Sequence, residues 1–137
     1  MPPDLRIELA QAWAAKARGD FISAEILAES NRAAGWVIGF YCQQSVEKCM
    51  KSQLVLANVK PPRTHLLREI LELANFAVLG FPVELSELDA LQTFAVADRY
   101  PILLPSGTSH ADVMRMVDSA RKAMAWIEAE LTLAAAS

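Results

Sequence analysis

Several residue types that would define a fold class or a site are scarce in this chain. Of its 137 residues, 5 are Gly, 2 are Cys and 2 are His. Cys42 and Cys49 stand seven positions apart on one expected helix, about 10 Å along its axis, which is too far for a disulfide. With no CxxC pair and so few histidines, a zinc site is not expected. We interpret both thiols as buried apolar groups in a reducing cytoplasm.

The chain also lacks an excess of positive charge and any long apolar run. Its 13 Lys and Arg stand against 16 Asp and Glu, so the net charge of −3 leaves only a local basic patch for nucleic acid. No run approaches the ~18 apolar residues of a membrane span, and the acidic N-terminus is unlike a signal peptide. P-loop and GxGxxG motifs are missing. We therefore expect a cytoplasmic protein with no membrane contact and no cofactor.

The shortage of glycine leaves long segments without helix breakers, in a chain that is 53% hydrophobic. Apolar residues recur at intervals of three and four, the period of a helix face. No linker or repeat divides the chain, so residues 1–137 are predicted to form one all-α domain, an up-and-down bundle of four to five helices. The segments expected to be helical are 4–31, 36–57, 64–75, a fourth that begins at Val83 or Ser86 and ends at Asp98, and a last helix that starts at Ser109.

The ends of these helices carry local signals. Asp4 and Thr64 are the expected N-caps of the first and third helices, and Ser109 with Asp112 has the spacing of a capping box. Gly19 is expected inside one continuous helix, because the apolar stripe keeps its phase across it. The residues expected to be buried are Trp13, Val46, Leu88, Val117 and Ile127.

The second helix has a polar face opposite its apolar one. Gln44, Glu47, Lys48 and Lys51 lie on that face, and Glu47 precedes Lys51 by four positions, the better orientation for a helical ion pair. One interpretation is a solvated face laced by a salt bridge, the usual role of such charges. The other is a polar stripe that lines a cleft or an interface.

Three further side chains are suited to chemistry or binding. His65 stands at the expected start of the third helix, where a neutral imidazole can act as a general base, although a lone His has many structural uses. Arg99 can grip a phosphate or carboxylate in a bidentate manner, and Tyr100 offers a stacking face and a hydroxyl. Glu47 is a candidate partner for Arg99 if the two helices bring them together.

Together these stretches resemble one family, the HEPN domain (higher eukaryotes and prokaryotes nucleotide-binding). Trp13, Ala17 and Asp20 fit its usual opening. The resemblance rests on the pattern Phe40-x-x-Gln43-Gln44-x-x-Glu47-Lys48-x-x-Lys51, followed by Thr64-His65-x-Leu67 and then by Arg99-Tyr100-Pro101.

The resemblance implies a small helical bundle, often a homodimer, commonly encoded beside a separate minimal nucleotidyltransferase and sometimes part of a toxin–antitoxin pair. Many members are metal-independent ribonucleases with an Arg-x4–6-His motif, and others bind nucleotides or are non-catalytic. This chain departs from the pattern twice. Leu66 stands where the family often has an Asp beside the His, so a carboxylate to orient His65 is missing. The positions after Arg99 that would hold the motif's His are Leu104, Pro105 and Ser106.

Three functions follow as hypotheses, and enzymatic activity is left open among them. The leading one is a module that binds a nucleotide, RNA or a nucleotidyltransferase partner through Arg99, Tyr100, Lys48 and Lys51, with Gln44 and Glu47 in support. The second is a ribonuclease toxin in which Arg99 holds the phosphate and His65 is the general base. The third is a purely structural helical dimer.

Overall fold

The computed structural model describes residues 1–73, 76, 79–96 and 108–137. Helices dominate these residues, and no strand occurs among them, which confirms the predicted all-α bundle. The helices are α1 (Pro3–Ser30), α2 (Gly35–Leu56), α3 (Leu67–Leu71), α4 (Leu85–Gln92), a 3₁₀ turn η1 (Thr93–Val96) and α5 (His110–Ala136).

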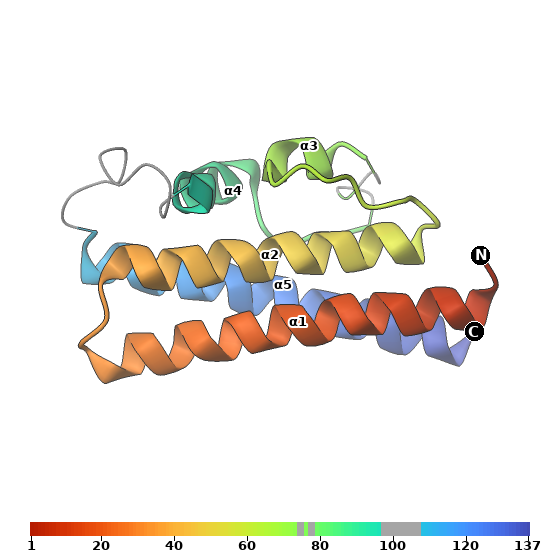
Figure 1. Cartoon of the computed structure of the whole chain (residues 1–137), viewed down its shortest axis with the longest axis horizontal. Coiled ribbons are helices and arrows are strands. Elements are labelled where there is room, and N and C mark those ends of the chain that lie inside the picture. The colour runs from red at the N-terminus through yellow and green to blue at the C-terminus, as the bar shows by residue number, and fades with distance from the viewer. Residues whose placement is uncertain (74–75, 77–78, 97–107) are drawn as a thin grey trace.

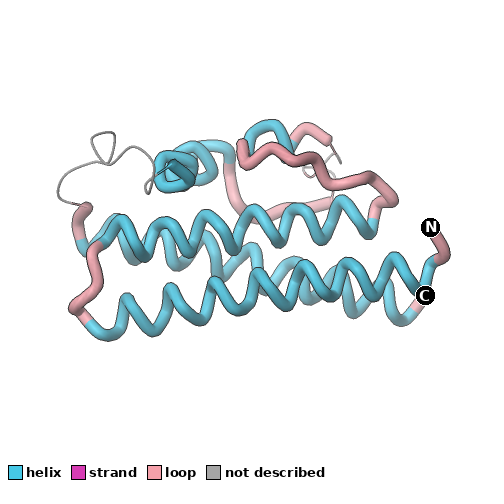
Figure 2. Tube along the Cα trace, viewed as in Figure 1, coloured by secondary structure: helices cyan, strands magenta, loops and turns pink. Residues whose placement is uncertain are grey.

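Three long helices form the body of the bundle. In Figure 1, α1, α2 and α5 run side by side along the longest axis, and the short helices α3 and α4 lie together on one side of α2. Figure 2 shows the loop after α2 doubling back along that helix on the way to α3. The third helix is much shorter than the predicted 64–75: residues 64–66 still belong to the loop beside α2, and the helix ends at Leu71.

The antiparallel pair of α1 and α2 is drawn together by small residues and hydroxyl groups. Ser45 donates a hydrogen bond from Oγ to the carbonyl of Ala17 at 2.9 Å, and Ser52 donates one to the carbonyl of Ala10 at 2.7 Å. Such contacts need a close approach of the two backbones, which the small side chains allow. The first helix is continuous through Gly19, as predicted.

The predicted core is confirmed for the four aliphatic residues and is wrong for the tryptophan. Val46, Leu88, Val117 and Ile127 are at most 3% exposed. Trp13 is only half-buried: it packs against the core, and the Lys51 ammonium lies 5.7 Å from the centroid of its indole ring. A large amphipathic ring at the edge of α1 can be shared in this way between the core and a neighbouring cation.

The capping predictions have mixed outcomes. Ser109 and Asp112 form the predicted capping box at the start of α5. Asp4 is not an N-cap, because α1 begins one residue earlier at Pro3, where the missing N–H costs no hydrogen bond. Thr64 is not one either: its Oγ1 accepts from the backbone N–H of Leu66 at 3.1 Å, and Leu66 is the N-cap of α3.

The sharp return of the chain after α2 has a local cause. Asn58 adopts a left-handed conformation with φ of 60°, and the N–H of Val59 donates to the carbonyl of Leu54 at 2.8 Å, as in a Schellman motif. Pro61 and Pro62 then keep the chain extended, since neither can continue a helix. The loop of residues 57–66 is thereby directed back over α2.

A carboxylate on α4 attaches that helix to α5. Glu87 accepts from the backbone N–H of Glu84 in a capping box, from Ser119 Oγ at 2.8 Å and from Lys122 Nζ at 2.9 Å. Desolvation by itself would raise the pKa of Glu87, but these hydrogen bonds outweigh it and hold the pKa below its usual value.

This depressed pKa predicts a pH dependence of stability. A carboxyl with a lower pKa in the folded chain stabilises the fold above its unfolded pKa of about 4.5, and the contribution is lost as the pH falls through the folded value. The Glu87→Gln variant keeps a capping side chain but cannot titrate. Its free energy of unfolding is expected to lie below that of the wild type at pH 7 and to approach it at pH 3, measured by urea unfolding; a pH-independent difference would contradict this role.

Candidate functional site

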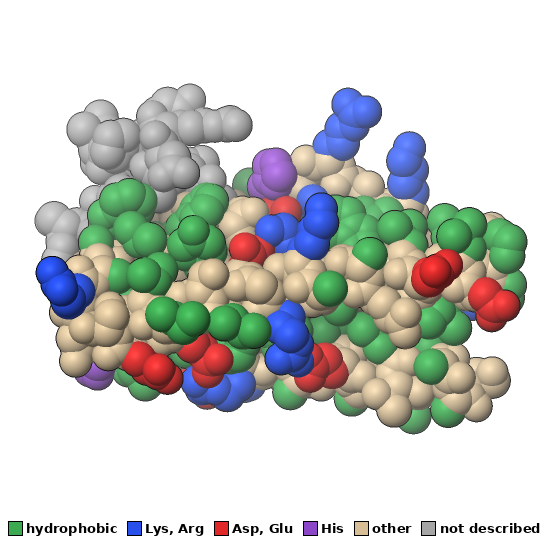
Figure 3. Space-filling model, turned by 60° about the horizontal axis from the view of Figure 1, so that its bottom comes forward, with side chains coloured by type: hydrophobic (Ala, Val, Ile, Leu, Met, Phe, Trp, Pro, Cys, Tyr) green, Lys and Arg blue, Asp and Glu red, His purple; other side chains and the backbone are tan. Residues whose placement is uncertain are grey.

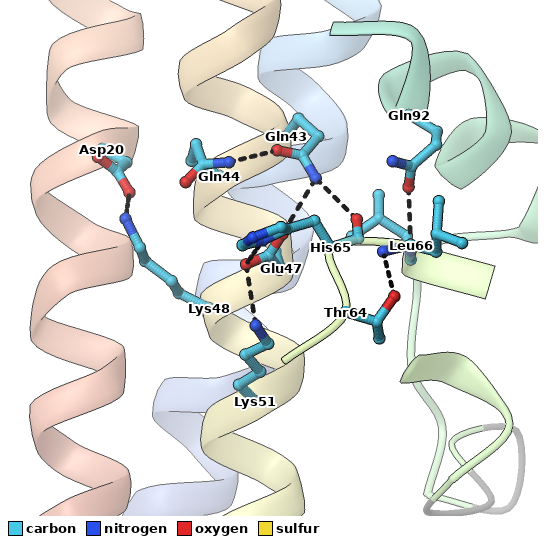
Figure 4. A network of polar contacts seen from close by, with 11 residues as sticks. Asp20, Gln43, Gln44, Glu47, Lys48, Lys51, Thr64, His65, Leu66 and Gln92 are labelled. Carbon is cyan, nitrogen blue, oxygen red and sulfur yellow. Dashed lines mark hydrogen bonds and ion pairs between the residues drawn. The ribbon is translucent and has the colours of Figure 1, made fainter. Parts of the chain in front are cut away.

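The polar face of α2 is covered over much of its length. Glu47 is 3% exposed, Lys51 is 4% exposed and Gln43 is fully buried, while Gln44 and Lys48 are half-buried. The interpretation of a solvated helix face is therefore wrong for Glu47 and Lys51. The end of the 57–66 loop brings His65 against Glu47 and Gln43 (Figure 4), and Trp13 of α1 lies beside Lys51.

Glu47 is the centre of a connected set of polar contacts. Its carboxylate accepts from Lys51 Nζ at 3.1 Å, which confirms the predicted i, i+4 ion pair, and from Gln43 Nε2 at 3.4 Å. His65 Nδ1 lies 3.1 and 3.2 Å from its two oxygens. Gln44 Nε2 extends the set by donating to Gln43 Oε1 at 2.7 Å. We call Gln43, Gln44, Glu47, Lys51 and His65 the His65 network.

His65 is held at one edge and open at the other. Its side chain is 67% exposed although its Nδ1 touches the buried carboxylate, and its backbone carbonyl accepts from Gln43 Nε2 at 3.4 Å. An ionised carboxylate can only accept a hydrogen bond, so Nδ1 carries the proton. In the neutral ring Nε2 then bears the free lone pair, and Nε2 is the atom available to a ligand.

The carboxylate that the sequence pattern lacks beside His65 is supplied from another element. Leu66 cannot orient the imidazole, but Glu47, 18 positions earlier, does so across the contact between α2 and the loop. The expectation that no carboxylate orients His65 is therefore wrong. A carboxylate bonded to the inner nitrogen fixes both the tautomer and the ring orientation, the arrangement that acid–base and binding histidines use.

Lys48, the other lysine of the polar face of α2, is also in an ion pair. Lys48 forms an ion pair with Asp20 of α1, a half-buried contact that joins the two helices beside the His65 network (Figure 4). The carboxylates of Asp20 and Glu47 and the ammonium groups of Lys48 and Lys51 together carry no net charge while His65 is neutral. Figure 3 shows acidic, basic and histidine side chains gathered in the middle of this face, with hydrophobic side chains on either side.

Two candidate residues fall outside the described part of the chain. Arg99 and Tyr100 belong to 97–107, so their place in the site and the pairing of Arg99 with Glu47 stay predictions. Conversely, sequence reasoning gave no role to Gln43 or to the pairing of Asp20. The signal for Gln43 was its spacing of four from Glu47 and eight from Lys51, which places all three on one helix face.

Other features of the described residues lie apart from this network. Burial raises the pKa of Cys42 and of Cys49 to about 12, so both are thiols and not thiolates at neutral pH. A cavity of about 690 Å³ lies between α4 and α5. Of its three acids, Glu87 and Asp112 are bound in capping boxes and Asp118 pairs with Arg121 at 3.6 Å. Within the described ranges, no three His, Cys, Asp or Glu side chains are grouped as metal ligands would be. None of the helices in these ranges is both long and apolar enough to cross a membrane.

The family assignment agrees with this arrangement. The family model of the HEPN domain matches residues 10–130, which include most of α1, all of α2 and the His65 network. The chain therefore belongs to the HEPN domain family. At the level of the family, this is a module associated with nucleotides or RNA. Searches of curated proteins and of solved structures returned no match.

Proposed function

We propose that this protein binds RNA or a nucleotide at the His65 network, as a homodimer that acts with a separately encoded minimal nucleotidyltransferase. The observation that carries the proposal is the exposed His65 ring held by the buried Glu47 carboxylate. Burying a carboxylate is costly unless it is paired and hydrogen-bonded. A protein that needed only packing at this position could use an apolar residue, so a fixed and accessible imidazole favours a role in contact with a ligand.

The residues of the network have distinct parts in this proposal. His65 Nε2 contacts the ligand, accepting from a hydroxyl when the ring is neutral and donating to a phosphate when it is protonated. Glu47 and Gln43 orient the ring, and the Lys51 ammonium balances the negative charge of Glu47. Lys48, Arg99 and Tyr100 are further predicted contacts, and Lys48 would leave its ion pair with Asp20 to reach a ligand. Ile22 and Ile26, exposed one turn apart on α1, are apolar residues that a second copy could cover.

Binding by the His65→Ala variant tests the proposal. Loss of a hydrogen bond to a charged group costs about 1.5–3 kcal/mol, so we expect RNA or nucleotide affinity to fall about ten- to a hundredfold in a fluorescence titration. The matched control is His110→Ala, which removes the exposed histidine at the start of α5 and should bind normally. Equal affinity of the wild type and the His65→Ala variant would refute the proposal.

The same contact favours one alternative, a metal-independent ribonuclease. A neutral imidazole whose Nδ1–H is held by a carboxylate has the form of a general base at Nε2. In that case purified protein should cut RNA without added metal, and His65→Ala should abolish cutting while RNA is still bound. The leading proposal expects the RNA to remain intact.

A further inference from the structure

The two α2 lysines beside His65 are in ion pairs, but among the described residues two other cations near His65 in the sequence are not. Lys48 pairs with Asp20, and Lys51 pairs with Glu47. By contrast, Lys60 and Arg63 are both exposed on the 57–66 loop, and neither forms an ion pair with any residue in the described part of the chain. The accessible positive charge next to His65 is therefore on the loop and not on α2.

The backbone of this loop fixes how the two cations are spaced. Lys60 and Pro61 each precede a proline, which confines both to extended conformations, and the two prolines themselves have a fixed φ. In an extended proline-type helix the rise is about 3.1 Å per residue with three residues per turn. This extended run spaces the Cα atoms of Lys60 and Arg63 by about 9 Å. The chain bends at Arg63, and His65 follows two residues later.

Both ends of the loop are anchored to the bundle. At its start, the N–H of Val59 donates to the carbonyl of Leu54 at 2.8 Å. At its end, His65 is held by Glu47 and Gln43, and the N–H of Leu67 donates to Gln92 Oε1 at 2.8 Å. A short segment with prolines in the middle and hydrogen bonds at each end has little freedom to lose when a ligand binds. The backbone that carries Lys60 and Arg63 is thus preorganised.

We propose that Lys60 and Arg63 bind separate phosphates of a single RNA strand that runs along the 57–66 loop and ends its path at His65. This rests on the proposed function and narrows its ligand from any nucleotide to a strand with several phosphates. A row of cations about 9 Å apart spans more than one phosphate, whereas a mononucleotide offers a single phosphate group that would be gripped by converging donors. Strand binding through such a positively charged path is the usual mode for single-stranded nucleic acids.

The experiment compares the double variant Lys60→Gln/Arg63→Gln with the wild type, using a fluorescent single-stranded RNA of about 12 nucleotides and AMP as probes. Loss of two phosphate contacts should weaken RNA binding about tenfold at low salt and reduce the slope of log K against log salt by about 1.4. Affinity for AMP should not change. The matched control is Arg32→Gln, an exposed cation in the turn between α1 and α2, at the opposite end of α2 (Figure 1).

A charge-preserving variant separates the loss of charge from any disturbance of the loop. Lys60→Arg/Arg63→Lys should restore both the affinity for RNA and the salt slope. The proposal is overturned if the glutamine variant binds RNA with unchanged affinity and slope, or if it loses RNA and AMP to the same extent. A wild-type protein that binds neither probe would refute the proposed function itself. If the wild type binds RNA and AMP but the glutamine variant binds both equally well, only the proposed path of the RNA strand is refuted.

Discussion

Replacing Glu47 by alanine is expected to destabilise the fold by about 3–5 kcal/mol, a large fraction of the stability of a domain this size. The side chains of Glu47 and Lys51 are only 4% and 6% exposed, so the variant would leave the Lys51 ammonium buried with no counter-charge. It would also remove acceptors from Gln43 and His65. Urea unfolding followed by circular dichroism measures the change.

A double variant distinguishes a buried ion pair from ordinary loss of packing. Glu47→Leu/Lys51→Met removes both charges and keeps apolar volume, and its stability should be close to that of the wild type, as for other buried pairs that are replaced together. Its His65 ring would no longer be oriented, so RNA binding should still fall. If Glu47→Ala costs less than about 1 kcal/mol, the carboxylate is not the buried centre that the contacts describe.

Replacing Leu67 by alanine is the second change with a large expected effect. Leu67 begins α3, is fully buried and follows His65 by two residues. Truncating a fully buried leucine costs about 2–5 kcal/mol, part of it from the cavity left behind. Because this residue fastens the end of the 57–66 loop to the bundle, the variant should also release His65, and the backbone amides of 65–67 should exchange faster with deuterium.

The neighbouring residue provides the control for that change. Leu66 has the same side chain but is 47% exposed, so Leu66→Ala should alter the free energy of unfolding by no more than about 0.5 kcal/mol. Equal destabilisation by the two variants would show that burial of Leu67 does not anchor the loop. If the backbone amides of 65–67 exchange at the wild-type rate in Leu67→Ala, Leu67 does not hold His65 in position.

The parts of the fold that follow a helical period could be predicted from the sequence. The continuous α1, the apolar face of α2 and the capping box at Ser109 each depend on residues within a few positions of one another. The short α3 could not be predicted from such local signals. Its residues include good helix formers, but Asn58 turns the chain and the prolines keep it extended, so the preceding segment packs on α2 as a loop.

The site was only partly predictable for a related reason. The ion pair between Glu47 and Lys51 is a local i, i+4 contact and was expected, but the contact between His65 and Glu47 joins positions 18 apart and exists only because the loop doubles back. This separation in sequence also explains the wrong expectation for His65: the adjacent Leu66 offers no carboxylate, and the carboxylate that orients the ring comes from a different helix. Lys48 was predicted as a ligand contact, and its ion pair with Asp20 of α1, 28 positions away, was not expected. Polar pairs across elements depend on packing that sequence periodicity does not specify.

The most direct test of the central claim is an NMR titration of the imidazole rings with single-stranded RNA. The chain has 2 His, so His110 at the start of α5 is an internal reference. We expect the free protein to show His65 with its proton on Nδ1, and we expect RNA to shift the Nε2 and ring-carbon signals of His65 while those of His110 stay in place. If His65 carries its proton on Nε2, or if saturating RNA leaves its signals unchanged, the Glu47-held histidine is not the point of contact.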